Sequence, residues 1–103
     1  MILISVDTSR RIEALFPEQD WRRVSDYLMN ECGDNLPLVE TSYTELAERI
    51  RFAVLKLSRG NFGRLVEESR HAAIDWRDIL VAAGFADDPE SHLAWEPGLD
   101  RSE

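Results

Sequence analysis

The sequence predicts an all-α fold: a compact single domain built as a bundle of five or six short helices. Apolar residues recur three and four positions apart along most of the chain, whereas the period-two alternation typical of half-buried strands is nearly absent. Residues that begin and end helices follow one another at short intervals, which predicts tight turns. The 103 residues, 44% of them apolar, suit one domain with its own core. Because the predicted helices differ in length, we expect several steep crossings.

The N-terminal region is expected to hold one short helix. Residues 2–6 form either one short strand or an extended arm that packs on the core. Asp7, Thr8 and Ser9 then offer side-chain oxygens that can cap a helix ending near Phe16.

A second helix is expected after Pro17, which suits a first turn because the N–H that proline lacks has no helical partner there. Gly33 can end this helix, and residues 34–40 form a loop. The apolar stripe of the helix recurs at helical spacing and consists of Trp21, Val24, Leu28 and Cys32.

The third helix has the clearest start signal. Ser42 and Glu45 fit a capping box, in which each side chain can bond to the backbone N–H of the other residue, and Gly60 can end the helix. Phe52 and Leu55 lie away from its main apolar face, so something other than the partner of that face must bury these two side chains. Either another helix of the same chain covers them, or they mark a homodimer seam or a partner patch. The main face consists of Leu46, Ile50, Ala53, Val54 and Leu57.

Cap residues predict three further helices, over 62–73, 76–83 and 89–95. Residues 96–103 are expected to form a flexible acidic tail of the same domain. The cap residues are Asn61, Asp75 and Asp88.

The charge balance is strongly acidic. The chain has 12 Lys and Arg against 20 Asp and Glu, a formal net charge of −8. A protein that grips phosphate backbones normally carries the opposite balance, so nucleic-acid binding is disfavoured. The excess of acidic residues either favours binding to a basic protein partner or only keeps the protein soluble.

The acidic excess is concentrated near the C-terminus, where residues 85–103 carry six acidic groups and one basic group. Trp95 lies among them, and it either pins this segment to the body or serves as an exposed anchor for a partner. The candidate partner-binding residues of this region are Asp87, Asp88, Glu90, Trp95 and Glu96.

Basic residues gather between positions 49 and 66, where no acidic residue occurs. Arg49, Lys56 and Arg59 lie on one face of the third helix. They either pair with the acidic tail or with Glu45 and Glu48, or they form a local site for an anion or a partner.

Few residues suggest catalysis or metal binding. Cys32 is the only cysteine, so the chain can form neither an internal disulfide nor a cysteine-based zinc site, and its place on the apolar stripe indicates a small buried hydrophobe. Glu68/His71 and Asp88/His92 have metal-compatible spacing but lack the further ligands that a site needs. Because no nucleophile elbow, phosphate loop or dinucleotide fingerprint is present, we expect no catalytic residue, cofactor or metal site.

The sequence shows no membrane or secretion signal. Its longest apolar run, residues 79–86, has eight residues, whereas a membrane span needs about 20. The N-terminus lacks the basic region of a signal peptide. We therefore expect a cytoplasmic protein.

In size and composition the chain is similar to small acidic bacterial proteins that neutralise a toxin or another basic enzyme, although this resemblance involves no particular residues. The leading hypothesis is a noncatalytic protein–protein interaction domain for a basic partner. One alternative is a self-associating helical adaptor that uses Phe52, Leu55 and the basic cluster. Another is a helix-turn-helix-like nucleic-acid binder, which the acidic balance disfavours.

Overall fold

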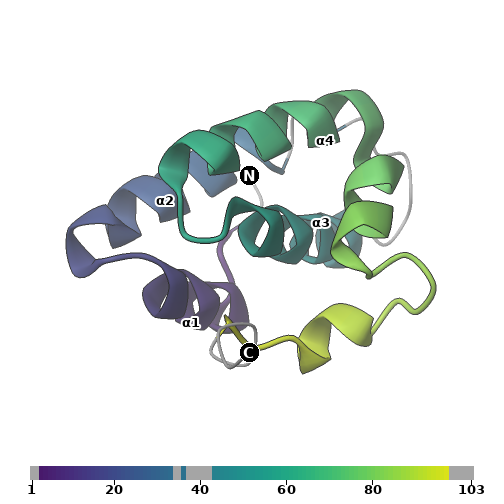
Figure 1. Cartoon of the computed structure of the whole chain (residues 1–103), viewed down its shortest axis with the longest axis horizontal. Coiled ribbons are helices and arrows are strands. Elements are labelled where there is room, and N and C mark those ends of the chain that lie inside the picture. The colour runs from purple at the N-terminus through teal and green to yellow at the C-terminus, as the bar shows by residue number, and fades with distance from the viewer. Residues whose placement is uncertain (1–2, 34–35, 37–42, 98–103) are drawn as a thin grey trace.

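The computed structural model describes residues 3–33, 36 and 43–97, and within these ranges it is all-helical with no strand. The all-α class is confirmed, but the described residues form four α-helices, fewer than the expected five or six, together with one 3₁₀ helix (Figure 1). The elements are α1 (Val6–Leu15), α2 (Glu18–Glu31), α3 (Tyr43–Ser58), α4 (Phe62–Ala83) and η1 (Ser91–Ala94).

The difference in number arises mainly in α4. The helices expected over 62–73 and 76–83 are two halves of this one element, which bends at Asp75 (φ −149°, ψ 86°). The Asp75 carboxylate accepts a hydrogen bond from the Asp78 N–H at 3.4 Å, as a cap residue does, but only one residue leaves the helical conformation. In the segment 89–95, where a sixth helix was expected, only the four residues of η1 are helical.

The N-terminus of α1 differs from the expectation. Ser5, rather than Asp7, Thr8 or Ser9, is the N-cap residue, and its hydroxyl accepts a hydrogen bond from the Thr8 N–H at 3.1 Å. Because this bond starts the helix at Val6, residues 3–5 form a short arm, and its Ile4 packs against the core. Over these three residues the arm, not the strand, is the form observed, whereas Val6 belongs to α1.

The start of α2 lies one residue later than expected. Pro17 is the N-cap residue of α2 rather than part of its first turn. The capping box of Ser42 and Glu45 lies outside the described residues because Ser42 does, and so does most of the loop 34–40.

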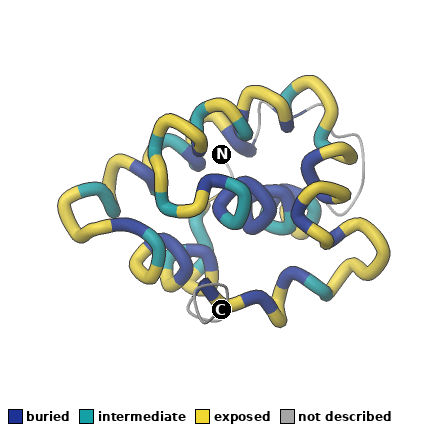
Figure 2. The backbone as a smooth tube through the Cα atoms, in the orientation of Figure 1, coloured by how far each residue is buried: buried dark blue, intermediate teal, exposed yellow. Residues whose placement is uncertain are grey.

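The core surrounds α3, which is buried along most of its length (Figure 2). This helix makes its most extensive contact with α4 and also contacts α1 and η1. Val24, Leu28 and Cys32 from the predicted stripe of α2 are fully buried, while Trp21 is half-buried. Residues Ile50 and Phe52 to Leu55 of α3 are all 0% exposed, so both apolar faces of this helix are covered by the chain itself.

After α4 the chain turns at Gly84 and returns past η1 towards α1, along the bottom of Figure 1. Residues 85–97, called the C-terminal segment below, include buried Trp95 and buried Pro97. Of the expected tail 96–103, residues 98–103 lie outside the described residues. In the part of the chain that the structure describes, no helix is both long and apolar enough to cross a lipid bilayer.

Candidate functional site

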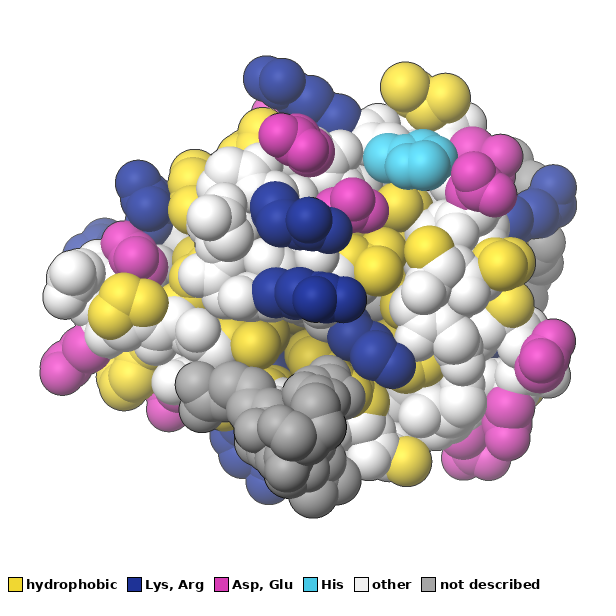
Figure 3. Space-filling model, in the orientation of Figure 1, with side chains coloured by type: hydrophobic (Ala, Val, Ile, Leu, Met, Phe, Trp, Pro, Cys, Tyr) yellow, Lys and Arg dark blue, Asp and Glu magenta, His cyan; other side chains and the backbone are white. Residues whose placement is uncertain are grey.

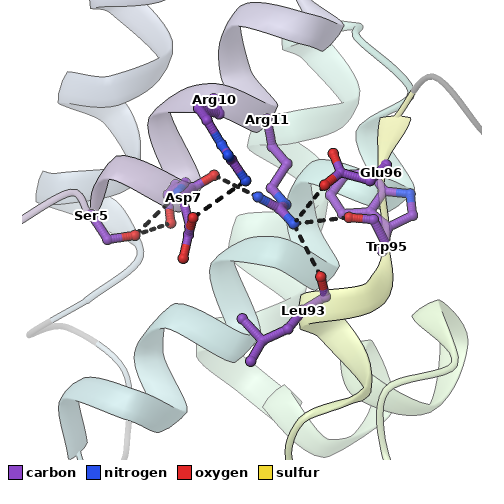
Figure 4. A network of polar contacts seen from close by, with 8 residues as sticks. Ser5, Asp7, Arg10, Arg11, Leu93, Trp95 and Glu96 are labelled. Carbon is purple, nitrogen blue, oxygen red and sulfur yellow. Dashed lines mark hydrogen bonds and ion pairs between the residues drawn. The ribbon is translucent and has the colours of Figure 1, made fainter.

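The C-terminal segment is held to the body by Arg11, a residue of α1 that is only 2% exposed (Figure 4). Its Nη2 atom donates hydrogen bonds to the carbonyl oxygens of Leu93 at 3.2 Å and Trp95 at 3.1 Å. The same atom lies 3.4 Å from a carboxylate oxygen of Glu96. Because these acceptors lie more than eighty positions away in sequence, Arg11 joins the two ends of the described chain.

An aromatic cluster completes this attachment. The ring centroid of Phe52 lies 4.9 Å from that of His92 and 6.4 Å from that of Trp95, both in edge-on geometry. Phe85 contacts the same two rings. Trp95 is 6% exposed, so it pins the segment to the body and offers no exposed anchor. Phe52 and Leu55 are likewise covered by their own chain and form no surface patch.

Arg49 and Lys56, which the sequence assigned either to internal ion pairs or to a local anion or partner site, donate to backbone carbonyl oxygens. Arg49 donates to the carbonyl oxygens of Phe85 and Ala86, each contact at 3.2 Å. Lys56 donates to the carbonyl oxygen of Ala83 at 3.0 Å. Phe85 and Ala86 follow α4, so Arg49 holds the start of the C-terminal segment against α3. Ala83 is the last residue of α4, which has no basic residue in its own last turn, so Lys56 complements the partial negative charge of that helix end.

Arg51 performs the same role for α2 and was not identified from the sequence as a structural residue. It is 1% exposed, and its guanidinium donates to the carbonyl oxygens of Cys32 at 2.7 Å and Leu28 at 3.3 Å. A further bond at 3.0 Å reaches the carbonyl oxygen of Leu3 in the N-terminal arm. One feature of the sequence could have indicated this role. The last turn of α2 contains no basic residue, so its carbonyl oxygens need donors from elsewhere.

The remaining basic residues of the cluster lie nearer the surface. Arg59 is exposed, and it follows α3 with a positive φ of 53°. Arg64 is exposed and donates to the carbonyl oxygen of Leu57 at 3.1 Å. Figure 3 shows Lys and Arg side chains in a row over α3, below α4. Acidic side chains on α4 lie close above this row, so the face is mixed in charge.

Between α3, the second half of α4 and the C-terminal segment lies a cleft of about 710 Å³, called the acidic cleft below. Three carboxylates and one guanidinium line it, together with one imidazole and four apolar side chains. Of the expected candidates, the structure brings Glu90 and Arg49 to this cleft, and it adds Glu45 and Glu48, which were not candidates for partner binding. The lining residues are Glu45, Leu46, Glu48, Arg49, Trp76, Pro89, Glu90, His92 and Leu93.

The remaining acidic candidates surround this region without lining the cleft. Asp87 and Asp88 are exposed in the loop that leads to Glu90. Glu96 is exposed as well, but it lies beside Arg11. The structure therefore separates Glu96 and Trp95, which attach the segment, from Asp87, Asp88 and Glu90, which face solvent.

Two buried groups have shifted pKa values that bear on chemistry. Burial lowers the pKa of His92 below its ordinary value, with Glu48 opposing and Arg49 adding to the shift. Burial raises the pKa of the Cys32 thiol to about 12, so this cysteine stays protonated as the buried hydrophobe that its stripe position predicted. His71 lies 3.4 Å from a carboxylate oxygen of Asp78 on α4.

Within the described ranges, no three His, Cys, Asp or Glu side chains are grouped closely enough to hold a metal ion. Comparison of the chain with protein-family models, with curated proteins and with solved structures gives no match.

Proposed function

We propose that this protein is a noncatalytic interaction domain of the cytoplasm that binds a basic protein partner through the acidic cleft and the adjoining exposed loop. A toxin or another basic enzyme, whose active surface the domain would occupy, fits this role. The observation that carries the proposal is the excess of carboxylates over available cations around the cleft.

The charges of the site support this proposal. Glu45, Glu48 and Glu90 line the cleft, and the loop before it adds the exposed Asp87 and Asp88. Among the described residues that line the cleft, the only cation is Arg49, whose guanidinium donates to carbonyl oxygens of the C-terminal segment. A positively charged partner surface would supply the missing complement and would be attracted from a distance.

The use of cations inside the molecule strengthens the same argument. Arg11 and Arg51 are buried against backbone carbonyl oxygens, and Lys56 caps the end of α4. These residues contribute to the formal charge of −8 but present little positive charge to a partner. The surface is therefore more acidic than the composition alone indicates.

The test begins with a basic protein that co-purifies with this one, and it measures the affinity of the purified pair. Glu45, Glu48 and Glu90 are changed together to Gln, and the matched control changes the exposed Glu13, Glu18 and Glu67 to Gln. Both variants alter the net charge equally, so only the position of the charge differs.

We expect affinity to fall with rising salt, and we expect the cleft variant to lose at least about tenfold more affinity than the control. Equal losses in the two variants would show that only the total charge matters and would reject the cleft as the binding site. Binding that does not depend on salt would reject the proposal of a basic partner.

A second candidate function, self-association, is supported by two exposed apolar side chains on α4. Ile74 is 83% exposed and Val81 is 64% exposed, and they lie on either side of the bend at Asp75. These two side chains replace Phe52 and Leu55, which are buried, as candidate contacts for a helical adaptor. Light scattering with Ile74→Glu tests it, because a dimer that uses these side chains would dissociate.

A further inference from the structure

The acidic cleft combines a charged and an apolar lining in a way that suits one kind of side chain. Its volume of about 710 Å³ lies within the range of ligand-binding pockets, and it is large enough for a protruding side chain. Leu46, Trp76, Pro89 and Leu93 provide apolar contacts, and Glu45, Glu48 and Glu90 provide carboxylates. A long side chain with an apolar stem and a cationic head matches both parts of this lining.

The cleft also contains a polar group that its own chain does not satisfy. His92 is 6% exposed, and its Nδ1 atom is buried with no hydrogen-bond partner among the described residues. Burial lowers the pKa of this imidazole, so the ring is neutral near neutral pH and one of its nitrogens is an acceptor. The neutral ring adds no positive charge to the cleft, so the carboxylates of the lining keep their attraction for a cationic ligand.

Several aromatic residues in this protein already accept a guanidinium. The guanidinium carbon of Arg77 lies 5.0 Å from the ring centroid of Trp76, a residue that also lines the cleft. The corresponding distance is 3.9 Å for Arg23 over Phe62. An indole ring has two faces, and its stacking on a planar guanidinium is more favourable than its contact with a compact ammonium.

From this lining we infer that the acidic cleft binds an arginine side chain presented by the basic partner. The inference rests on the proposed function and makes it specific. The apolar stem lies against Leu46, and the guanidinium stacks on Trp76 and donates to carboxylates of the cleft. Arginine is favoured over lysine because its five planar donors can serve several acceptors at once.

The test uses the full chain and a capped Gly-Gly-Arg-Gly-Gly peptide, with the same peptide carrying citrulline or lysine as comparisons. Citrulline keeps the length and shape of arginine but lacks its charge. Backbone amide shifts and the indole signal of Trp76 are followed by NMR during titration. The protein variants are Glu48→Gln in the cleft and Glu67→Gln as an exposed control.

We expect saturable shifts centred on the cleft, with binding of the citrulline peptide at least about tenfold weaker than that of the arginine peptide. Glu48→Gln should weaken arginine binding severalfold, and Glu67→Gln should leave it unchanged. Equal binding of citrulline, tighter binding of lysine, or shifts spread over the whole acidic surface would each overturn the inference.

The test of arginine binding and the test of the proposed function can fail independently. If the arginine peptide does not bind, but the partner still loses affinity when the cleft carboxylates are neutralised, the arginine inference fails and the proposed function stands. If neutralised carboxylates leave the partner's affinity unchanged, the proposed function fails independently of the peptide result.

Discussion

At the scale of single residues, this small protein uses arginine as an internal donor for carbonyl oxygens at helix and turn ends. Arg11, Arg49 and Arg51 each donate to two or more carbonyl oxygens, and Arg11 and Arg51 are almost completely buried. Burial of a charge is costly unless hydrogen bonds compensate for the lost hydration. The planar guanidinium offers five donors in a fixed geometry, whereas the ammonium of lysine offers three.

Replacement of Arg11 tests how much this arrangement stabilises the fold. Arg11→Met keeps most of the apolar stem but removes the donors to the carbonyl oxygens of Leu93 and Trp95. We expect the free energy of unfolding to fall by about 2–4 kcal/mol, because buried acceptors lose their partner. The matched control is Arg10→Met, since Arg10 is exposed and only pairs with Asp7 on the surface.

The measurement is urea unfolding followed by circular dichroism. Arg10→Met should change the free energy of unfolding by less than about 0.5 kcal/mol. Equal effects of the two replacements would contradict the structural role assigned to Arg11.

His92 predicts a pH dependence of stability. Burial holds its pKa in the folded protein below the ordinary value of 6.5, which the unfolded chain retains. Between these two values the unfolded chain binds a proton that the folded protein does not, so acidification favours unfolding. The stabilising contribution is complete above about pH 6.5 and is lost as the pH falls from there towards the folded pKa.

The corresponding experiment compares unfolding free energies between about pH 7.5 and about pH 5.5. His92→Gln should flatten the decline that the wild type shows in this range. His71→Gln is the matched control, because His71 lies on the surface beside Asp78. A decline that persists undiminished in His92→Gln would refute the assignment.

At the scale of elements, the turns after α3 and α4 both use glycine with a positive φ, but they differ in their surroundings. At Gly60 φ is +79°, and a Cβ atom would lie 2.6 Å from the carbonyl oxygen of Leu15. At Gly84 φ is +83°, and a Cβ atom would meet nothing within 4 Å. The turn at Gly60 is therefore fixed by backbone conformation and by the end of α1, whereas that at Gly84 is fixed by conformation alone.

This difference predicts unequal costs for the same substitution. Gly84→Ala should lower the free energy of unfolding by about 1 kcal/mol, because alanine adopts the left-handed conformation poorly. Gly60→Ala should cost at least about twice as much, since it adds a clash with backbone that cannot rotate away. Thermal and urea unfolding of both variants provide the measurement, and similar costs at the two positions would disprove the close approach of α1.

Local patterns predicted most of the helices but not how the helices join. The spacing of Val24, Leu28 and Cys32 identified the buried face of α2, because helical periodicity is a property of neighbouring residues. Asp75 was identified as a cap, but whether one non-helical residue separates two helices or only bends one is not a local property. Packing on α3 contributes to that outcome.

At the scale of the whole molecule, the candidate site depends on how the chain returns after α4. Counting charges identified Glu90, Asp87 and Asp88, but it did not place Glu45, Glu48 and Trp76 beside Glu90. That arrangement results from the bend of α4 and from the attachment of the C-terminal segment to α1. Periodicity contains no information about such distant contacts, so the acidic residues could be predicted but the cleft could not.

The C-terminal segment is thus both a wall of the cleft and a cover of the core, and a shortened chain that ends at Pro89 tests the second role. Such a chain would lack His92 and Trp95, which contact Phe52, a residue that is 0% exposed in the full chain. It would also leave Arg11 buried without the carbonyl acceptors that it binds. We expect the shortened chain to lose several kcal/mol of stability, of the order that loss of large core side chains costs, and to bind the dye ANS.

Leu93→Ala in the full chain is the control, since Leu93 is 45% exposed and its side chain is not part of the core. This variant should unfold close to the wild-type midpoint and bind no more dye. The C-terminal segment contributes both to folding and to the proposed partner binding, so its deletion would affect both. Point substitutions of the cleft carboxylates are therefore used to measure partner binding separately. If the shortened chain had the same unfolding midpoint as the full chain, the core would pack without the segment. One wall of the cleft could then be removed without loss of stability.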